Sequence, residues 1–372
     1  MPPADWRMTI AALGVVGMAL LNVQDRYEDA QRDDRIASVE SDFAGQRAVQ
    51  DRLGRLTHSD SGMTYDALRG EGLAGPAELE GYGRYVPHEQ TRLLQQSVIQ
   101  LVKRPPGTAE WQPWCTGNKV EIDDESYISF AAHCVGSING IKGAGPAVVD
   151  VADVVPYEFG FQLLGADGRR DGRTLLADGV SVDYGRRDWA LLRPAPAAAV
   201  DDGYAAVQAL PYRELLAAPQ PLAGEEARMA GLPSASANTL VEGVGIYLGR
   251  GMNEQGKELD YVGLRGATAP ETNACNFGAS GSAAVTASGR LTGPLAALNV
   301  LGYPDGTTPL PPAERDMYLR ERLDIEAIVG VDTSAFGIVC GYTPAESPAV
   351  DDMLAGFNVN AADLGITVTV NK

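Results

Sequence analysis

Short apolar runs separated by turn residues dominate the chain after about Leu93. Glycine-containing sequences such as Ala-Asp-Gly, Pro-Asp-Gly and Ala-Ser-Gly separate several of these runs and are typical of turns. Strands this short, at regular spacing and without alternating helical segments, favour β-barrels or a β-sandwich over a parallel α/β sheet. The clearest candidate strands are Ser97–Val102, Glu121–Ala131, Trp189–Leu192, Val241–Leu248, Ala283–Thr286 and Leu295–Val300.

The N-terminus has a different pattern, because residues 8–23 contain no charge and are mostly apolar. A full membrane span needs about 20 such residues, so the run is slightly short. No small-residue cleavage site follows it, and acidic residues such as Asp25 and Glu28 do, whereas Arg7 precedes it. This charge asymmetry favours an uncleaved signal-anchor with the body outside the cytosol. A cleaved signal peptide and a buried or interfacial helix are the alternatives.

Two segments connect this run to the candidate strands. Residues 24–57 are densely charged, with apolar side chains such as Val39 and Phe43 at near-helical intervals. They predict a solvated helical stalk, with a partly disordered linker as the alternative. Residues 58–92 are rich in Gly, Ser and Tyr without periodicity and predict a linker.

Composition narrows the classes of function. The 372-residue chain is 45% hydrophobic, which indicates a globular protein, and its formal charge of −19 argues against nucleic acid as a partner. With three histidines and no CxxC pair, the sequence suggests no metal site and no cofactor. The four cysteines could form two disulfides in an oxidising compartment outside the cytosol.

Of the three histidines, His58 and His88 lie in polar or proline-flanked stretches and are expected to be exposed linker residues. His133 instead ends the run Tyr-Ile-Ser-Phe-Ala-Ala and directly precedes Cys134. A base at the end of a strand lies at a rim that substrate can reach, although a buried structural histidine would show the same pattern.

Two further motifs carry candidate chemistry. Asp188 directly precedes the apolar run Trp-Ala-Leu-Leu, and a carboxylate buried there needs a hydrogen-bond partner such as an imidazole N–H. Ser280 lies in Gly278-Ala-Ser-Gly-Ser, where glycines permit a tight turn that could present the N–H groups of Gly278 and Ser280 as an oxyanion hole. Each motif alone is also found in plain strand caps and turns.

The three motifs together, in the order His133, Asp188, Ser280, resemble the trypsin/chymotrypsin family of serine peptidases over roughly residues 93–345. The resemblance implies a mostly β fold of two antiparallel β-barrels, preceded by the N-terminal apolar segment and helical stalk. It also implies the disulfides Cys115–Cys134 and Cys275–Cys340. The expected division is 1–23 signal-anchor or signal peptide, 24–57 stalk, 58–92 linker, 93–200 first barrel, 201–345 second barrel and 346–372 C-terminal extension.

The sequence departs from the animal digestive enzymes of that family in three places. Ala279 stands where those enzymes have an aspartate that pairs with a newly cut N-terminus, so the site should assemble without such a cut. The pocket-base position falls near Asn273, which is uncharged and does not support a preference for a Lys or Arg residue there. The segment starting at Pro312 reads as an inserted helix.

The resemblance implies a serine endopeptidase that hydrolyses protein or peptide substrates, with His133 as base, Asp188 as its orienting carboxylate and Ser280 as nucleophile. The body would lie in the periplasm or outside the cell, membrane-anchored through the N-terminus or secreted. The first alternative is a catalytically silent binding or scaffold module with the same fold. The second is an unrelated β-rich surface protein.

Overall fold

The computed structural model describes residues 73–105, 107–135, 149–150, 158–183, 187–236, 239–253, 256–264, 273–276, 278–301 and 312–357. The chain divides into two units, Met1–Glu71 and Gly72–Lys372, and all the described residues lie in the second. The expected signal-anchor and stalk lie outside the described residues. Among the helices of the described ranges, none is long and apolar enough to cross a membrane.

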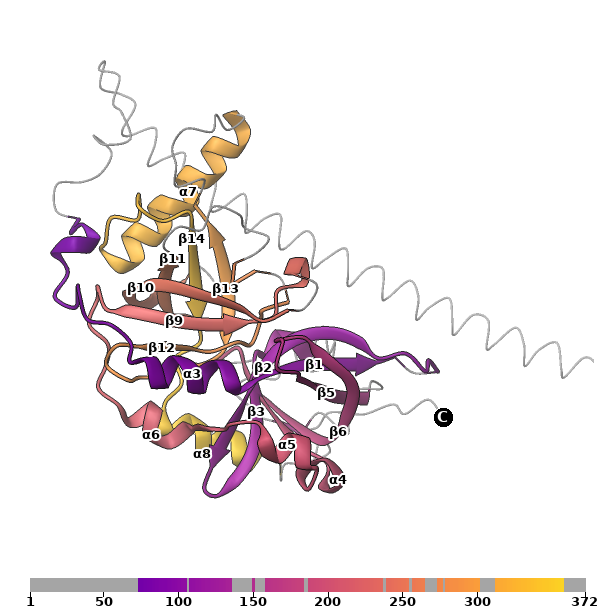
Figure 1. The fold of residues 1–372 in the computed structure, drawn as a ribbon. Coiled ribbons are helices and arrows are strands. Elements are labelled where there is room, and N and C mark those ends of the chain that lie inside the picture. The colour runs from indigo at the N-terminus through magenta and orange to yellow at the C-terminus, as the bar shows by residue number, and fades with distance from the viewer. Residues whose placement is uncertain are drawn as a thin grey trace, which may run out of the picture. The chain divides into compact units, whose positions relative to one another are not determined.

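The first sheet closes into a six-stranded antiparallel barrel (Figure 1). Each strand pairs with the next in the order β1-β5-β6-β7-β3-β2, and β2 pairs back with β1. Two short strands join this barrel, β4 (Val149–Asp150) beside β6 and β8 (Leu210–Pro211) parallel to β2. The barrel strands are β1 Val98–Arg104, β2 Gln112–Ile122, β3 Glu125–Phe130, β5 Glu158–Leu164, β6 Arg170–Asp183 and β7 Trp189–Pro194.

One apolar run of the sequence proves to be parts of two strands. The run Glu121–Ala131 is interrupted by the turn between β2 and β3, where Asp123 and Asp124 have φ of 53° and 67°. Two successive residues with positive φ are the conformation that a tight antiparallel hairpin requires, and aspartate tolerates it better than most residues. The acidic pair is therefore a turn signal inside the apolar run.

The second sheet contains six antiparallel strands in the order β12-β9-β10-β11-β14-β13. Its two ends meet through backbone hydrogen bonds, because Leu295 donates to Ser282 O over 2.7 Å and Gly281 donates to Leu295 O over 3.0 Å. A mostly β body with a closed barrel and this second sheet confirms the expected fold and is consistent with a chymotrypsin-like double barrel. The strands are β9 Glu226–Gly231, β10 Val241–Met252, β11 Glu258–Leu264, β12 Ala284–Thr286, β13 Leu295–Val300 and β14 Ile338–Tyr342.

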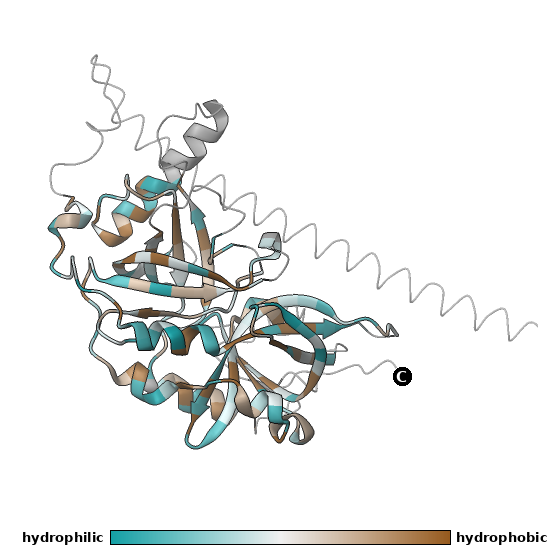
Figure 2. Ribbon diagram, viewed as in Figure 1, coloured by the Kyte–Doolittle hydropathy of each residue, from teal (hydrophilic) through white to brown (hydrophobic). Residues whose placement is uncertain are grey.

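Apolar side chains fill the interior of each sheet and the space between the two sheets. Along many strands, apolar and polar residues alternate (Figure 2). The cluster between the sheets includes Val120 and Trp189 from the first and Val285 from the second. Trp189 is fully buried, and its indole N–H donates to Ser129 Oγ over 2.9 Å. The residue after Asp188 is thus fixed in the core, which restricts where the Asp188 carboxylate can lie.

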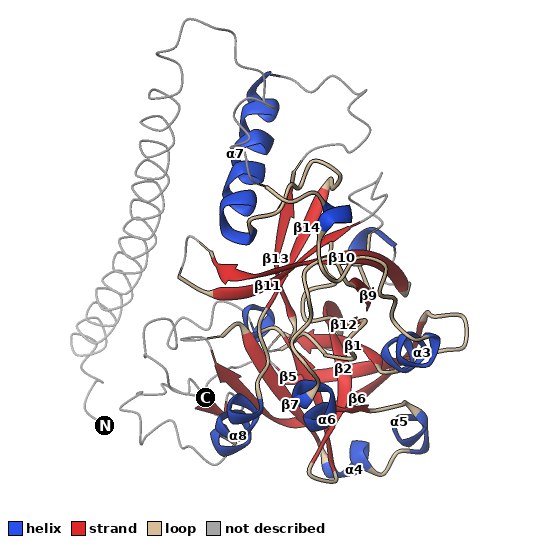
Figure 3. Ribbon diagram, turned by 90° about the vertical axis from the view of Figure 1, so that its left-hand side faces the viewer, coloured by secondary structure: helices blue, strands red, loops and turns tan. Residues whose placement is uncertain are grey.

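The longer helices lie beside the sheets (Figure 3). The inserted helix expected after Pro312 is present as α7 and runs to Val329, in contact with β10 and β13. The helical segments are η1 Pro76–Glu78, α3 His88–Gln96, η2 Ala132–Val135, α4 Pro196–Ala199, α5 Asp202–Ala206, α6 Tyr212–Ala217, η4 Ser234–Ser236, α7 Pro312–Val329 and α8 Ser347–Gly356.

Two segments that flank the expected barrels make contacts with the folded body. Residues 73–92, expected to be linker, belong to the folded body: Val86 is buried, and Arg84 pairs with the fully buried Glu225 side chain at 3.3 Å. In the expected C-terminal extension, α8 packs on the first barrel, where Met353 O accepts from Ser181 Oγ over 2.7 Å. The contacts of both segments are made by tertiary packing with residues that are distant in the sequence.

Candidate active site

His133 lies just after β3, in the single turn η2. Its neighbours Ala132 and Cys134 are buried, whereas 41% of the His133 side chain is exposed. A disulfide joins Cys134 to Cys115 of β2, with their Cα atoms 6.1 Å apart. The turn is therefore fixed from both sides while the imidazole remains accessible to a ligand.

The carboxylate of Asp188 accepts two hydrogen bonds from His133. Oδ1 accepts from the His133 backbone N–H over 2.7 Å, and Oδ2 lies 2.7 Å from the ring Nδ1. Because a carboxylate accepts and the side chain of Asp188 is only 7% exposed, the ring must hold its proton on Nδ1. In a neutral imidazole, Nε2 then has a lone pair that can accept a proton.

Ser280 lies in a turn that requires its flanking glycines. Gly278 and Gly281 have φ of +90° and +94°. A Cβ at Gly281 would lie 2.3 Å from Thr116 O, and one at Gly278 would lie 2.7 Å from the backbone N of Ser234. Side chains are therefore excluded at both positions by the backbone conformation and by neighbouring backbone.

Thr116 ties this turn to the first barrel. Its N–H donates to Ser280 O over 3.0 Å, and its hydroxyl donates to Gly278 O over 2.8 Å. The preceding residue, Cys115, forms the disulfide to Cys134, whose Sγ lies 3.7 Å from Ser280 O. The backbone that carries Ser280 and the turn that carries His133 are thus fixed to the same short piece of β2.

A cavity of about 480 Å³ is lined by both His133 and Ser280. Its walls also include Trp114, Cys275 and the β13 residues 295–298. The structure therefore brings His133 and Ser280 to one cavity and bonds Asp188 to His133. Cys275 forms the second disulfide, with Cys340 of β14.

Some backbone N–H groups of the Ser280 turn donate hydrogen bonds to described residues, and others do not. The N–H of Ala279 donates to Asn276 O, and that of Gly281 donates to Leu295 O. Within the described part of the chain, the N–H groups of Gly278 and Ser280 make no hydrogen bond. Gly278 and Ser280 both line the adjoining cavity.

Asn273 and Ala279 were also considered as site residues in the sequence, and both make contacts that support the local structure. Asn273 is not one of the residues lining the Ser280 cavity, and its Oδ1 accepts from the Cys275 N–H over 2.9 Å, as in a turn. Ala279 is fully buried in the second sheet's core. Among the residues that the structure describes, no three His, Cys, Asp or Glu side chains gather as metal ligands do.

Sequence reasoning missed two walls of the cavity. The β13 segment was recognised as a strand but not as part of the site, and Trp114 was not singled out. The Trp114 indole donates to Cys134 O, while the Lys103 ammonium lies 2.9 Å from the indole ring centroid. Burial lowers the pKa of Lys103. A tryptophan at a strand position has no local signal that distinguishes a cavity wall from ordinary packing.

No family model matches the chain, and no curated protein matches it. Solved structures resemble it at low identity. AL20, a thermostable serine protease from an extremophilic microorganism, is 13% identical over 72% of this chain and all of that one, with a TM-score of 0.43. The protease Anisep from Arthrobacter nicotinovorans is 12% identical, covering 71% of this chain and 96% of that one, with a TM-score of 0.41.

A third structure, the protease domain of MamO from Magnetospirillum magneticum, is 14% identical over 70% of this chain and 96% of that one, with a TM-score of 0.37. At these TM-scores the likeness supports no inference about activity.

Proposed function

We propose that the protein is a serine endopeptidase in which Ser280 is the nucleophile, His133 the general base and Asp188 the carboxylate that orients His133. The observation that supports this most is the His133–Asp188 hydrogen bond beside a cavity that Ser280 also lines. That bond leaves Nε2 as the proton acceptor, and a serine sharing the cavity with it is the group whose proton it would take.

In the proposed reaction, Ser280 Oγ attacks the carbonyl carbon of a peptide bond while His133 Nε2 takes the hydroxyl proton. The resulting oxyanion accepts hydrogen bonds from the N–H groups of Gly278 and Ser280. The tetrahedral intermediate collapses, the C–N bond breaks, and His133 gives its proton to the leaving amine. Water then attacks the acyl-enzyme with His133 again as base, which releases the acid and restores Ser280 Oγ–H.

The Asp188 carboxylate contributes by fixing the tautomer and by stabilising the imidazolium that forms when His133 is protonated. The Ala279 position has no carboxylate to pair with a cut N-terminus, so we propose that the site assembles on folding without such a cut.

We place the body outside the cytosol, because its two disulfides persist in oxidising compartments. Residues 8–23 would anchor it to the membrane through the stalk at 24–57. Fractionation of cells that express the full chain, compared with a chain lacking residues 1–23, tests this anchor. Loss of the protein from the membrane fraction on deletion is the expected result.

The test of the activity is covalent labelling by a fluorophosphonate, which reacts with a serine activated by a neighbouring base. We expect the wild-type protein to label and Ser280→Ala to remain unlabelled. Ser282→Ala is the matched control, because the Ser282 hydroxyl is buried without a hydrogen-bond partner among the described residues and its loss breaks no such bond. A folded wild-type protein that does not label would instead support the silent binding module.

A further inference from the structure

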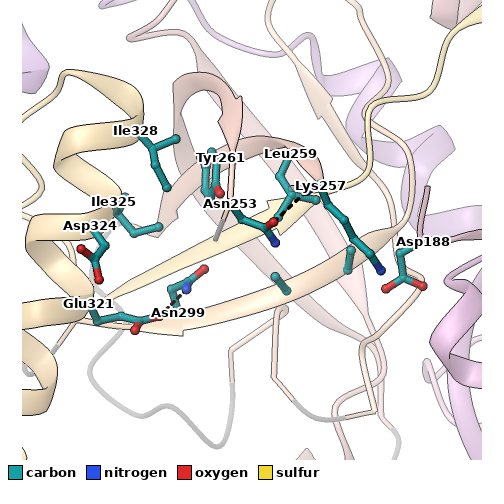
Figure 4. Close-up of a pocket in the computed structure, with 12 residues that line it drawn as sticks. Asp188, Asn253, Lys257, Leu259, Tyr261, Asn299, Glu321, Asp324, Ile325 and Ile328 are labelled. Atoms are coloured by element: carbon teal, nitrogen blue, oxygen red, sulfur yellow. Dashed lines mark hydrogen bonds between the residues drawn. The ribbon is translucent and has the colours of Figure 1, made fainter. Parts of the chain in front are cut away.

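A second cavity, of about 280 Å³, lies next to the candidate active site (Figure 4). Asp188 and Lys257 lie at one end of it, and Glu321 and Asp324 of α7 lie at the other. Its side walls include Ile325 and further apolar side chains of β11 and α7. The cavity thus combines acidic groups at one end with an apolar passage leading to them.

Two buried polar atoms in this cavity have no hydrogen-bond partner among the described residues. One is the hydroxyl oxygen of Tyr261, a residue only 1% exposed. The other is Asn299 Oδ1, although the Nδ2 group of the same side chain donates to Glu321 Oε1. Buried polar groups in native proteins are normally satisfied, so each of these atoms can form a hydrogen bond with a ligand in the cavity.

The polar groups that line this cavity define the chemistry of that partner. Asn299 Oδ1 and the Glu321 and Asp324 carboxylates can only accept hydrogen bonds, and the Tyr261 oxygen can also accept. Burial, together with the nearby Glu321 charge, raises the pKa of Tyr261 to about 12, so this hydroxyl is neutral at physiological pH. A cluster of acceptors with negative charge matches a cation that has several N–H donors.

The shape of the cavity favours such a cation at the end of an aliphatic stem. The cavity is lined by three aliphatic side chains in addition to its acidic groups, namely Leu259, Ile325 and Ile328. The side chains of lysine and arginine bury a flexible methylene stem while their charged head reaches polar groups.

The second cavity also adjoins the first along β13. Ala296 and Ala297 line both cavities, and the Asp188 that lines the second is hydrogen-bonded to the His133 that lines the first. β13 is the last strand in the order of its sheet, and it meets the other end of the sheet at Leu295. A peptide chain bound at Ser280 can therefore extend beside β13 and direct one of its side chains into the second cavity.

We infer that the cavity formed by Tyr261, Asn299 and α7 binds a lysine or arginine side chain of the peptide substrate, a few residues from the bond that is cut. This inference rests on the proposed peptidase function. It assigns to Glu321 and Tyr261 a role in selecting the substrate, and to α7 the role of supplying the acidic end of the subsite.

The test uses the full-length protein and fluorogenic peptides in which arginine, or its uncharged isostere citrulline, occupies each position in turn. We expect wild-type kcat/KM to favour arginine by at least about tenfold at one position, since charge-assisted hydrogen bonds are the strong ones. Glu321→Gln should reduce that ratio several-fold and leave the citrulline peptide unaffected. Tyr261→Phe should lower kcat/KM for both peptides, because the N–H groups of citrulline can also donate to the Tyr261 oxygen. Glu242→Gln, the same change at an exposed position of β10, should leave the ratio unchanged.

Thermal unfolding of each variant distinguishes a loss of substrate selectivity from a loss of folding stability. Tyr261→Phe removes a hydroxyl that bonds no described residue, so its melting temperature should stay at the wild-type value or rise. Labelled, active wild-type protein without an arginine preference, or a preference that Glu321→Gln does not alter, would overturn the inference while leaving the proposed function intact.

If the protein neither reacts with the fluorophosphonate nor cleaves peptides, a binding measurement still tests the subsite. Calorimetry with full-length Ser280→Ala compares the arginine and citrulline forms of one peptide. Tighter binding of the arginine form, lost on adding Glu321→Gln, supports the subsite even if the peptidase proposal fails. Equal binding of the two forms overturns it.

Discussion

At the scale of single residues, Asp188 has the most demanding set of contacts in the candidate site. It accepts from both the backbone and the ring of His133 and is almost completely buried. Its own backbone O accepts from the Thr343 hydroxyl over 3.3 Å, which links it to the second sheet. The carboxylate therefore holds one His133 tautomer in one orientation.

Replacing Asp188 by asparagine should reduce both peptide hydrolysis and fluorophosphonate labelling about 10³–10⁴-fold. The two oxygens of Asp188 accept from different His133 groups, so an amide replaces one of these acceptors with an NH₂ group that can only donate. At the ring, that NH₂ group favours the wrong tautomer. Labelling rates of wild type and Asp188→Asn measure this, with circular dichroism to show that the variant folds. A folded variant that labels at the wild-type rate would exclude Asp188 from the mechanism.

At the scale of secondary-structure elements, the site depends on how β2 is tied to its neighbours. Cys115 of β2 is bonded to Cys134 of η2, while Thr116 binds the turn that carries Ser280. The η2 segment is only four residues long, so its own backbone hydrogen bonds cannot hold it in place. The disulfide supplies that restraint.

Replacing Cys115 and Cys134 together by alanine should lower the free energy of unfolding by about 3 kcal/mol. The loop that this disulfide closes spans 19 residues of sequence separation, and the cross-link restricts the unfolded chain accordingly. Urea denaturation measures the loss, and activity per folded molecule should also fall because His133 loses its fixed neighbour. Unchanged stability would show that β2 and η2 are held by packing alone.

At the scale of the whole molecule, the described body buries several tyrosines in its cores. Burial raises the pKa of Tyr204, Tyr212, Tyr247 and Tyr342, and it raises that of Tyr261 to about 12. In the unfolded chain these phenols ionise near the ordinary tyrosine pKa of about 10. Above that pH the unfolded state binds fewer protons than the folded state, so the free energy of unfolding falls as pH rises.

We therefore expect stability to decrease between about pH 10 and 12, by up to about 1.4 kcal/mol per pH unit for each buried tyrosine. Chemical denaturation near neutrality and above about pH 10.5 tests this. All four cysteines are in disulfides, so no free thiolate is present to start disulfide exchange. A stability that stays flat over this range would mean that these phenols ionise freely in the folded protein.

The sequence alone determined the strand-rich body and the three motifs of the candidate site, because these depend on local features. A glycine pair around Ser280 permits one kind of turn, and an apolar run after Asp188 places the carboxylate at the start of a buried strand. The run Leu295–Val300 was predicted with the bounds that β13 has. In each case the residues that determine the local structure lie within a few positions of it in the sequence.

Only the tertiary structure decided what these segments meet. The contacts of Thr116 with Ser280, and the walls that β13 adds to both cavities, join residues far apart in the chain. The same is true of residues 73–92 and α8, which pack on the body through contacts with distant segments. Their energy comes from apolar area that is buried only when distant segments come together, and no local pattern encodes which surfaces will meet.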